Sequence, residues 1–215
     1  MKKSIYILMA VFALVACRRD PDLGELSSDF LVFTNYDTAA NFNAFITYYM
    51  PDSIMIIGDK DTPEYWTGND AEAILDTYAD NMGTCGYLRV ANKEEADLGL
   101  QISYIESVSY FVDYYNSPYW WNAYPGYWWP GYWGNWTDWY YPYPVVYSYS
   151  VGSLLTEMVD LTADAGTGTE RKLPVIWNSF LSGLLSNSSA LNIALTVRAV
   201  DQSFIQSPYL IQNEE

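Results

Sequence analysis

The stretch Leu98-Gly-Leu-Gln-Ile-Ser-Tyr-Ile-Glu-Ser-Val-Ser-Tyr-Phe-Val112 decides the fold, because apolar and polar side chains alternate along it. Apolar residues occupy every second position, with Glu106 as the single interruption: Leu98, Leu100, Ile102, Tyr104, Val108, Tyr110 and Val112. Polar residues share the other face: Gln101, Ser103, Ser107, Ser109 and Asp113. Successive side chains of a strand point to opposite faces. The pattern therefore predicts a strand of an antiparallel sheet that is covered on one face only.

Four further segments, rich in apolar, aromatic and β-branched residues, predict the strands around it. They are residues 30–36, residues 45–50 with 53–57, residues 145–161 and residues 172–180. Pro51 interrupts the second of these strands, because proline cannot donate a hydrogen bond to a neighbouring strand. Gly166-Thr-Gly168 lies between the last two and suits a hairpin turn.

A first amphipathic helix is predicted over residues 69–82. Its apolar residues follow the i, i+3, i+4 spacing of one buried helix face: Ala71, Ile74, Leu75, Tyr78 and Met82. We expect Asn69 to cap the helix, with Glu72 in the capping-box position, and Gly83 to end it.

A second helix is predicted near the C-terminus. Its stripe of apolar side chains has helical spacing: Ile193, Val197, Val200 and Phe204. Ser188 or Ser189 is expected to cap this helix, and Pro208 to stop it.

These elements follow one another in the order β-β-α-β-β-β-α. Strands and helices that do not alternate regularly predict an α+β fold. We therefore expect a mostly antiparallel β-sheet with two helices packed on one face. A chain of 215 residues is of single-domain size, and we place that domain at residues 29–208, followed by a short tail at 209–215.

The N-terminus has the features of a signal peptide. Lys2 and Lys3 precede an apolar run over residues 5–16, which is too short to cross a bilayer as a helix. The run ends in Leu14-Val-Ala-Cys17, which resembles the lipobox of bacterial lipoproteins. The resemblance implies that residues 1–16 are removed, that Cys17 is acylated, for example with palmitate, and that residues 17–28 form a tether.

Several acyl chains on one residue would hold the protein stably on a membrane. By resemblance to the enterobacterial sorting rule, Arg18 after the acylated cysteine favours the outer membrane. We expect a cell-envelope protein on the periplasmic or surface face. If Cys17 is acylated, Cys85 has no partner for an intramolecular disulfide, and we expect it to be a small buried residue.

Composition excludes several classes of function. The formal net charge of −16 argues against nucleic acid as a partner. The chain holds no histidine, which excludes a Ser-His-Asp triad, a Cys-His pair and every His-ligated zinc or haem site. No phosphate-binding loop or Cys-x-x-Cys motif occurs, and we expect no metal and no cofactor. Thr38 and Ser53 each match the short Asp-Ser/Thr-apolar acceptor pattern of a bacterial O-glycosylation system.

Residues 110–149 form an aromatic segment, with twenty aromatic residues and seven of the nine tryptophans. Pro-Gly-Tyr-Trp occurs in it twice, at 125–128 and 130–133. Because Pro-Gly pairs favour turns, we expect residues 114–144 to form a long excursion at the tip of a hairpin. Its candidate binding residues are Trp120, Trp121, Tyr124, Tyr127, Trp128, Trp129, Tyr132, Trp133, Trp136 and Trp139.

Three interpretations of this segment remain open. The rings can pack on one another and on the sheet. They can form an exposed contact surface for an envelope protein or the membrane interface. They can form a platform that stacks on sugars. We therefore expect a non-catalytic binding or structural module, with a carbohydrate-binding lipoprotein as the alternative. A carboxylate-dependent glycoside hydrolase, with Asp113 and Asp138 as its acidic pair, comes third.

Four places in the chain carry a family resemblance. They are Phe33-Thr-Asn-Tyr36, Gly86-Tyr87 with Ala96-Asp-Leu98, the segment 152–160 with Val175-Ile-Trp177, and residues 199–208. Together they resemble the bacterial envelope lipoproteins grouped as domain of unknown function 4136. The family's tryptophan is usually followed by a basic residue and glycine, whereas Asn178 and Ser179 follow Trp177 here. The resemblance implies an α+β fold in the envelope and no catalytic residues. From the residues alone we expect Trp177 to anchor the core.

Overall fold

The computed structural model describes residues 30–58, 64–107, 138–143, 151–163, 172–185 and 190–212. Its strands are β1 (Leu31–Tyr36), β2 (Thr47–Tyr49), β3 (Ile54–Ile57), β4 (Glu64–Trp66), β5 (Leu88–Arg89), β6 (Leu98–Ile105), β7 (Asp138–Tyr140), β8 (Ser153–Asp160) and β9 (Lys172–Ser182). Its helices are α2 (Asn69–Thr84) and α4 (Ile193–Ile205), with short 3-10 turns η2 (Phe42–Ala44), η3 (Lys93–Glu95) and η5 (Pro208–Leu210).

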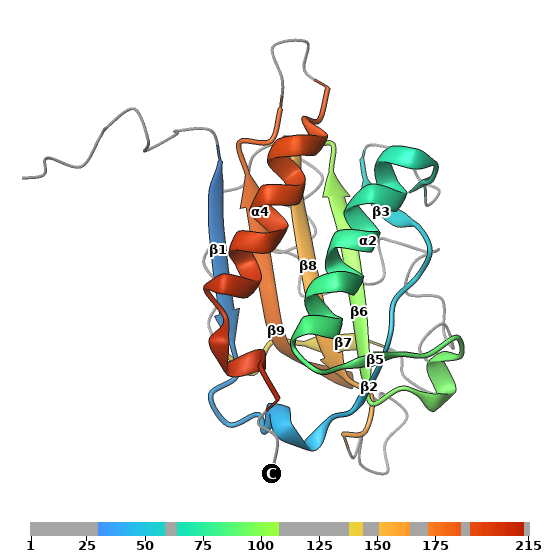
Figure 1. Cartoon of the computed structure of the whole chain (residues 1–215), viewed down its shortest axis with the longest axis vertical. Coiled ribbons are helices and arrows are strands. Elements are labelled where there is room, and N and C mark those ends of the chain that lie inside the picture. The colour runs from blue at the N-terminus through green and yellow to red at the C-terminus, as the bar shows by residue number, and fades with distance from the viewer. Residues whose placement is uncertain are drawn as a thin grey trace, which may run out of the picture.

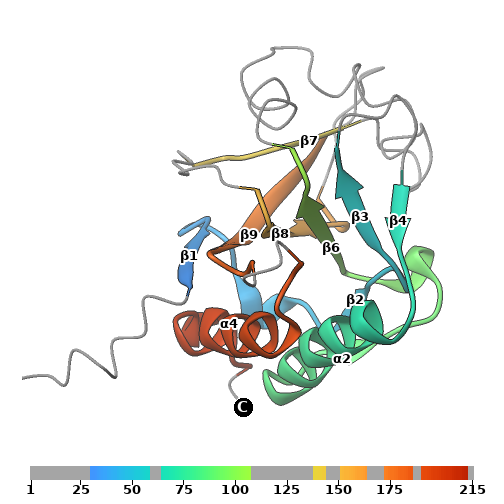
Figure 2. The ribbon, with the colours of Figure 1, turned by 90° about the horizontal axis from the view of Figure 1, so that it is seen from above.

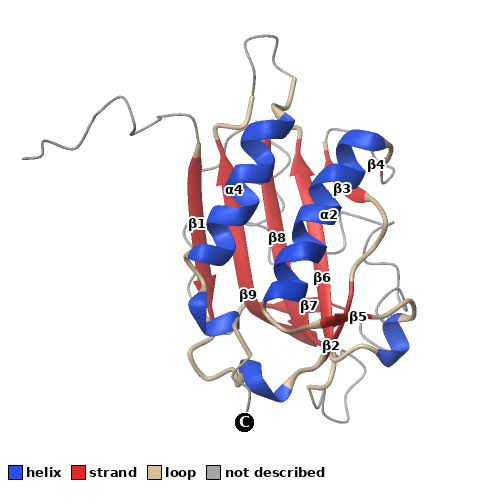
Figure 3. Cartoon of the chain, viewed as in Figure 1, coloured by secondary structure: helices blue, strands red, loops and turns tan. Residues whose placement is uncertain are grey.

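The two helices lie side by side across one face of a mixed sheet (Figures 1 and 3). Among the described residues the strand order is β1-β9-β8-β6-β2-β5, with β3 and β4 beside β6 and with β7 beside β9. The longest ladders, β6 with β8, β8 with β9 and β1 with β9, are antiparallel. The predicted α+β class, with a mostly antiparallel sheet and both helices on one face, is confirmed. The short strands β4, β5 and β7 are additional to the predicted order.

The strand that decides the fold lies inside the sheet. β6 pairs with β8 from Leu98 opposite Asp160 to Ile105 opposite Ser153. Along its other edge β6 pairs in parallel first with β2 and then with β3. The predicted interruption at Pro51 is therefore the break between β2 and β3, two short strands that both pair with β6. Residues 108–112, the predicted end of this strand, lie outside the described residues, as does the predicted turn at 166–168.

Helix α2 buries the predicted face, Ala71, Ile74, Leu75, Tyr78 and Met82. Its predicted cap is wrong, because Gly68 is the N-cap and Asn69 is already helical. Gly68 has φ of +94°, a conformation that glycine adopts without the steric penalty of a side chain. The helix ends at Thr84, one residue beyond Gly83, and Gly86 with φ of +99° turns the chain away.

Helix α4 is capped by a residue other than the predicted serines. The Asn192 side chain accepts a hydrogen bond from the backbone N–H of Leu195 at 3.2 Å. An asparagine in this position satisfies an N–H group that the helix leaves unpaired. Ser188 and Ser189 lie outside the described residues. Pro208 begins η5 after the helix has ended.

The core lies between the helices and the sheet. Trp177 of β9 is fully buried there, donates its indole N–H to Ser207 Oγ at 2.9 Å and packs 5.5 Å from the Phe204 ring of α4. The prediction that Trp177 anchors the core is confirmed. Cys85 is buried as predicted, and burial raises the pKa of its thiol to about 11. No helix in the described ranges is long and apolar enough to span a bilayer.

The opposite face of the sheet departs from the prediction. Gln101 and Ser103, which the alternation of β6 assigns to a solvent-facing side, are each only 1% exposed. Alternation tells which residues share a face, but it does not tell whether another part of the chain covers that face. The prediction of a one-sided sheet is therefore wrong at β6.

Candidate functional site

A row of polar side chains crosses the sheet on the face away from the helices. Gln101 of β6 stands opposite Glu157 of β8, Glu157 opposite Asn178 of β9, and Asn178 opposite Asn35 of β1. Residues directly opposite in register have side chains on the same face and close enough to interact. Gln101, Glu157 and Asn178 are each at most 1% exposed. We call these four residues the polar row.

Residues 138–143, which we call the tyrosine strap, lie against this row. β7 pairs in parallel with the beginning of β9, from Asp138 opposite Lys172, and Figure 2 shows it on the far side of the sheet from α2 and α4. Directly after β7, Tyr141 donates its hydroxyl to Glu157 Oε1. Tyr143 donates to Asn178 Oδ1 at 2.9 Å, and the two tyrosine rings meet edge to face at 5.8 Å.

Glu157 is the chemically unusual member of the row. Burial raises the pKa of its carboxyl to about 8, although the hydrogen bond from Tyr141 lowers it. Burial disfavours the charged form of a carboxyl group, so these surroundings favour the protonated form of Glu157. The pKa of Tyr143 is also raised, first by burial and then by Glu157 nearby. The phenol of Tyr143 is therefore a neutral hydrogen-bond donor.

Gln101 completes the row with one unsatisfied atom. Its Nε2 donates to the backbone carbonyl of Ile102 at 3.0 Å. Its Oε1 is buried without a hydrogen-bond donor. A buried acceptor without a donor is uncommon and destabilising. The neighbour directly opposite in register is Glu157.

A carboxyl with a raised pKa beside two phenols has the composition of a general acid site. Catalysis also requires that a substrate atom reach the acid, and Glu157 is 1% exposed in this conformation. Among the described residues no group of three or more His, Cys, Asp or Glu side chains has the arrangement of a metal site. The polar row therefore forms a buried, hydrogen-bonded contact between the sheet and the tyrosine strap.

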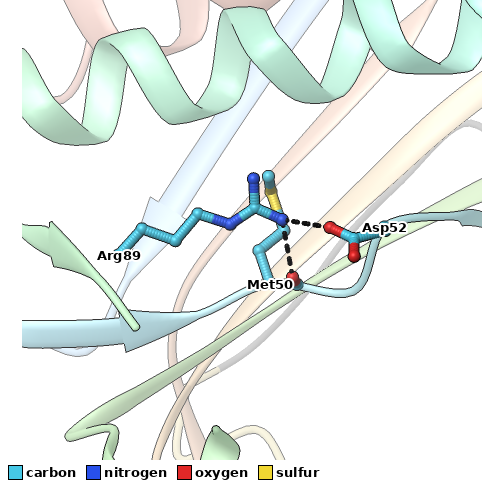
Figure 4. A network of polar contacts seen from close by, with 3 residues as sticks. All are labelled: Met50, Asp52 and Arg89. Atoms are coloured by element: carbon cyan, nitrogen blue, oxygen red, sulfur yellow. Dashed lines mark hydrogen bonds and ion pairs between the residues drawn. The ribbon is translucent and has the colours of Figure 1, made fainter. Parts of the chain in front are cut away.

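A second feature is a surface hollow of about 380 Å³ beside β2 and β5. Arg89 Nη2 donates there to the Met50 carbonyl at 3.0 Å and to Asp52 Oδ1 at 2.6 Å (Figure 4). The Asp52 side chain is 96% exposed, so water screens this ion pair. The hydrogen bond to Met50 links β5 to the residue that follows β2. The charges of Arg89 and Asp52 neutralise each other in the hollow.

Most of the predicted site residues lie outside the described residues. These are Cys17, Trp120, Trp121, Tyr124, Tyr127, Trp128, Trp129, Tyr132, Trp133 and Trp136. Trp139 has a described backbone in β7, opposite Leu173. Of the acidic pair considered for hydrolysis, Asp113 lies outside and Asp138 begins β7.

The strap revises the expected course of the aromatic segment. β6 and β8 form the predicted antiparallel pair, and the segment leaves β6 after Ile105. β7, however, pairs with the start of β9, and β9 pairs with β8 at the opposite end of that pair. Eight-residue strands place those ends about 23 Å apart at a rise of about 3.3 Å per residue. β7 therefore lies at the end of the sheet opposite to the point where the chain leaves β6, and not at the tip of the β6–β8 pair.

Sequence reasoning did not identify Gln101, Glu157, Asn178, Tyr141 or Tyr143 as a site. The available signal was Glu157 itself, a charged residue inside an apolar strand segment. Its neighbours come from three other parts of the chain, and only the strand register brings them together.

With this geometry in view, the comparisons with known proteins place the chain. Residues 32–209 match the protein family described as a domain of unknown function, DUF4136. The chain belongs to this family. The family that the sequence motifs predict is thereby confirmed.

A DUF4136 family protein from Bacteroides thetaiotaomicron has a crystal structure similar to this one. It is 54% identical, the TM-score is 0.76, and the match covers 86% of this chain and 99% of that one. The PelC dodecamer from Paraburkholderia phytofirmans matches at 10% identity and a TM-score of 0.40, over the same shares of the two chains. So low a score supports no statement about this chain. No curated protein matches it.

The motif residues of this DUF4136 protein mainly hold the fold together. Tyr36 stacks on Tyr209 with ring centroids 3.7 Å apart. Asp97 Oδ2 accepts the backbone N–H groups of Ile46 and Thr47 at 2.7 and 2.9 Å, which fixes the start of β2. Burial alone would raise the pKa of Asp97, but these hydrogen bonds outweigh it and lower the pKa. Together with the buried Trp177, these contacts give the motifs a structural role.

Proposed function

We propose that this DUF4136 protein is a non-catalytic binding module of the bacterial cell envelope. Cys17 carries the lipid that anchors it in the outer membrane, and the aromatic segment is its contact surface for another envelope protein. The lipobox-like Leu14-Val-Ala-Cys17 supports the anchor. The mature chain, without Lys2 and Lys3, has a formal net charge of −18, which supports partners other than nucleic acid.

One observation carries the binding role: the aromatic segment is attached to the rigid sheet near both of its ends. It follows β6 on one side and enters β7 on the other, and both strands are paired within the sheet. Binding residues commonly stand on connections that a rigid scaffold positions. Tryptophan and tyrosine dominate the energetics of protein interfaces. A segment of this composition between two fixed points suits a contact surface.

The same geometry weighs against catalysis. Glu157 is the one carboxyl with a strongly raised pKa among the described residues. It is buried and accepts a hydrogen bond from the Tyr141 hydroxyl. Its strand neighbours on both sides are amides rather than a second carboxyl. A glycoside hydrolase needs two carboxyl groups facing each other across a cleft that a sugar can enter.

The experiment uses the soluble form that begins at Arg18. Seven of nine tryptophans lie in the aromatic segment; of the other two, Trp66 is partly buried and Trp177 fully buried. Tryptophan fluorescence therefore reports mainly on the segment. We expect red-shifted emission that iodide quenches. Blue-shifted emission that iodide does not quench would show that the rings pack internally, and the contact-surface proposal would be lost.

Binding is then measured by protection from iodide, with solubilised outer-membrane proteins in one arm and a soluble glycan panel in the other. The triple variant Trp128→Ala, Trp129→Ala, Trp133→Ala should lose protection and keep its far-ultraviolet circular dichroism. Tyr65→Ala is the matched control, since Tyr65 is an exposed aromatic residue of β4 outside the segment. Protection by a glycan alone would favour the carbohydrate-binding alternative.

The anchor is tested separately in the full chain. Cys17→Ser should abolish palmitate labelling and move the protein from the membrane fraction to the soluble fraction. Cys85→Ser is the matched control, because Cys85 is buried in the folded domain. Unchanged labelling in Cys17→Ser would rule out the proposed lipid site without bearing on the aromatic segment.

A further inference from the structure

Glu157 is a buried carboxyl that faces no basic group among the residues that the structure describes. The groups that face it in the described part of the chain are the phenols of Tyr141 and Tyr143 on the strap, the amide of Gln101 on β6 and the amide of Asn178 on β9. None of these groups is positively charged. A buried carboxylate needs a cationic partner or several hydrogen-bond donors to offset the loss of water. Within the described ranges, the Tyr141 hydroxyl is the one donor that bonds to it directly.

Gln101 offers what a protonated carboxyl needs. A neutral carboxylic acid has one O–H donor in addition to its acceptor sites. Gln101 Oε1 is buried, has no donor and belongs to the residue directly opposite Glu157 in register. One proton on Glu157 Oε2 would supply the donor that Oε1 of Gln101 is missing, while Glu157 Oε1 accepts from Tyr141. Two independent features, the unpaired acceptor and the charge-free surroundings, are explained together.

We propose that Glu157 is held as a neutral acid hydrogen-bonded to Gln101 and Tyr141, and that this proton keeps the tyrosine strap closed on the sheet. When the strap opens, water reaches the carboxyl, which then gives its proton to solvent. The hydrogen bonds from Tyr141 to Glu157 and from Tyr143 to Asn178 break, and no covalent bond other than this O–H changes. Closing the strap takes the proton up again, because the carboxylate would face the oxygen of Gln101 in a buried site. Closure of the strap is therefore coupled to the uptake of one proton by Glu157.

The direction of the pH dependence follows from linkage. The closed-state pKa of Glu157 is about 8, against the ordinary value of 4.5 that applies when water surrounds the group. Below about pH 4.5 both states are protonated and the strap is most firmly closed. Between these values the opening equilibrium rises about tenfold per pH unit. Above about pH 8 it levels off, because the closed state also loses its proton. This inference does not depend on the proposed binding role of the aromatic segment.

Infrared difference spectroscopy tests the protonation state directly. The wild-type protein at pH 6 should show the C=O band of a protonated buried carboxylic acid, and Glu157→Gln should lose it. Glu94→Gln, at an exposed position of η3, is the matched control and should keep the band. Absence of the band from the wild type at pH 6 would overturn the proposal.

Hydrogen exchange tests the coupling to the strap. Protection of peptides that cover residues 138–143 should fall about tenfold per pH unit from pH 5.5 to 7.5, after correction for the intrinsic pH dependence of exchange. Glu157→Gln cannot lose a proton, so its strap should show no such fall. Equal pH profiles for the two proteins would show that the strap opens independently of Glu157.

The Gln101→Leu substitution should change the melting temperature in one direction if the proposed hydrogen bond exists and in the opposite direction if it does not. If Glu157 donates to Gln101, leucine leaves a buried O–H without an acceptor, and the melting temperature at pH 6 should fall. If Gln101 Oε1 has no donor, leucine removes an unpaired buried acceptor, and the melting temperature should rise. A rise would overturn the proposed hydrogen bond.

Discussion

The two faces of the sheet are covered in different ways. On the helix side, large apolar side chains of β6, β8 and β9 meet the apolar stripes of α2 and α4, where the Tyr87 hydroxyl is buried without a hydrogen-bond partner among the described residues and several other polar atoms are paired one to one. Tyr78, for example, shares a hydrogen bond of 2.5 Å with Thr156. On the strap side, neighbouring strands contribute the polar row, and the tyrosine strap, residues 138–143, is hydrogen-bonded to it through Tyr141. The helix side is built from self-contained elements, whereas the strap side depends on contacts that no single element contains.

The difference predicts where stability resides. Burial of apolar surface is the main favourable term in folding and is lost wherever a large core side chain is truncated. A buried polar row contributes little net free energy, and its contribution depends on protonation. The helix side should therefore carry most of the stability at every pH, and the strap side most of its pH dependence.

The largest effect is expected for Trp177→Ala on the helix side. The substitution removes a fully buried indole and its hydrogen bond to Ser207, and it should lower the free energy of unfolding by about 3–5 kcal/mol. The measurement is denaturant unfolding followed by circular dichroism. Trp66→Ala is the matched control, since Trp66 is only partly buried against Tyr104. Equal losses in the two variants would contradict the assignment of Trp177 to the core.

Glu157→Gln on the strap side should stabilise the protein at neutral pH. A group whose pKa is raised in the folded state contributes stability that is complete below pH 4.5 and is lost as the pH rises to about 8. Each pH unit in this window removes about 1.4 kcal/mol, so the wild type has lost about 3 kcal/mol by pH 7. Glutamine avoids this loss, and we expect a gain of about 2–3 kcal/mol at pH 7.

The measurement is the free energy of unfolding at pH 5, 6, 7 and 8. The wild type should fall with pH relative to Glu157→Gln, and the two curves should approach each other at pH 5. Parallel curves would mean that Glu157 ionises alike in the folded and unfolded protein, which its burial opposes. Trp177→Ala serves as the comparison from the other face, since its loss should be the same at each pH.

The same contrast explains what the sequence predicts and what it does not. The buried face of α2 follows from spacing alone, because Ala71, Ile74, Leu75, Tyr78 and Met82 belong to one helix. β6 follows from alternation for the same reason. The caps at Gly68 and Asn192 depend on local backbone geometry, which competing residues one to four positions away can also satisfy.

The polar row needs information of another kind. Gln101, Glu157 and Asn178 meet through strand register, and a shift by one residue would move each to the other face. Tyr141 and Tyr143 come from a segment whose composition indicates turns and gives no sign of a strand. Alternation in β6 separates two faces correctly, but it does not reveal that Gln101, on the face expected to meet solvent, is only 1% exposed.

The smallest effect is expected for Tyr143→Phe, which removes one hydrogen bond from strap to sheet. Phenylalanine keeps the ring beside Tyr141 and deletes the hydroxyl that donates to Asn178 at 2.9 Å. A buried hydrogen bond contributes about 1 kcal/mol, and Asn192→Ala, which removes the cap of α4, should cost about the same. Global unfolding cannot tell these variants apart, but hydrogen exchange by mass spectrometry can. Tyr143→Phe should increase exchange at residues 138–143 and leave α4 unchanged, whereas Asn192→Ala should do the reverse. If either variant increases exchange both at residues 138–143 and in α4, the two faces of the sheet open as one unit. The helix side and the strap side would then not be independent of each other.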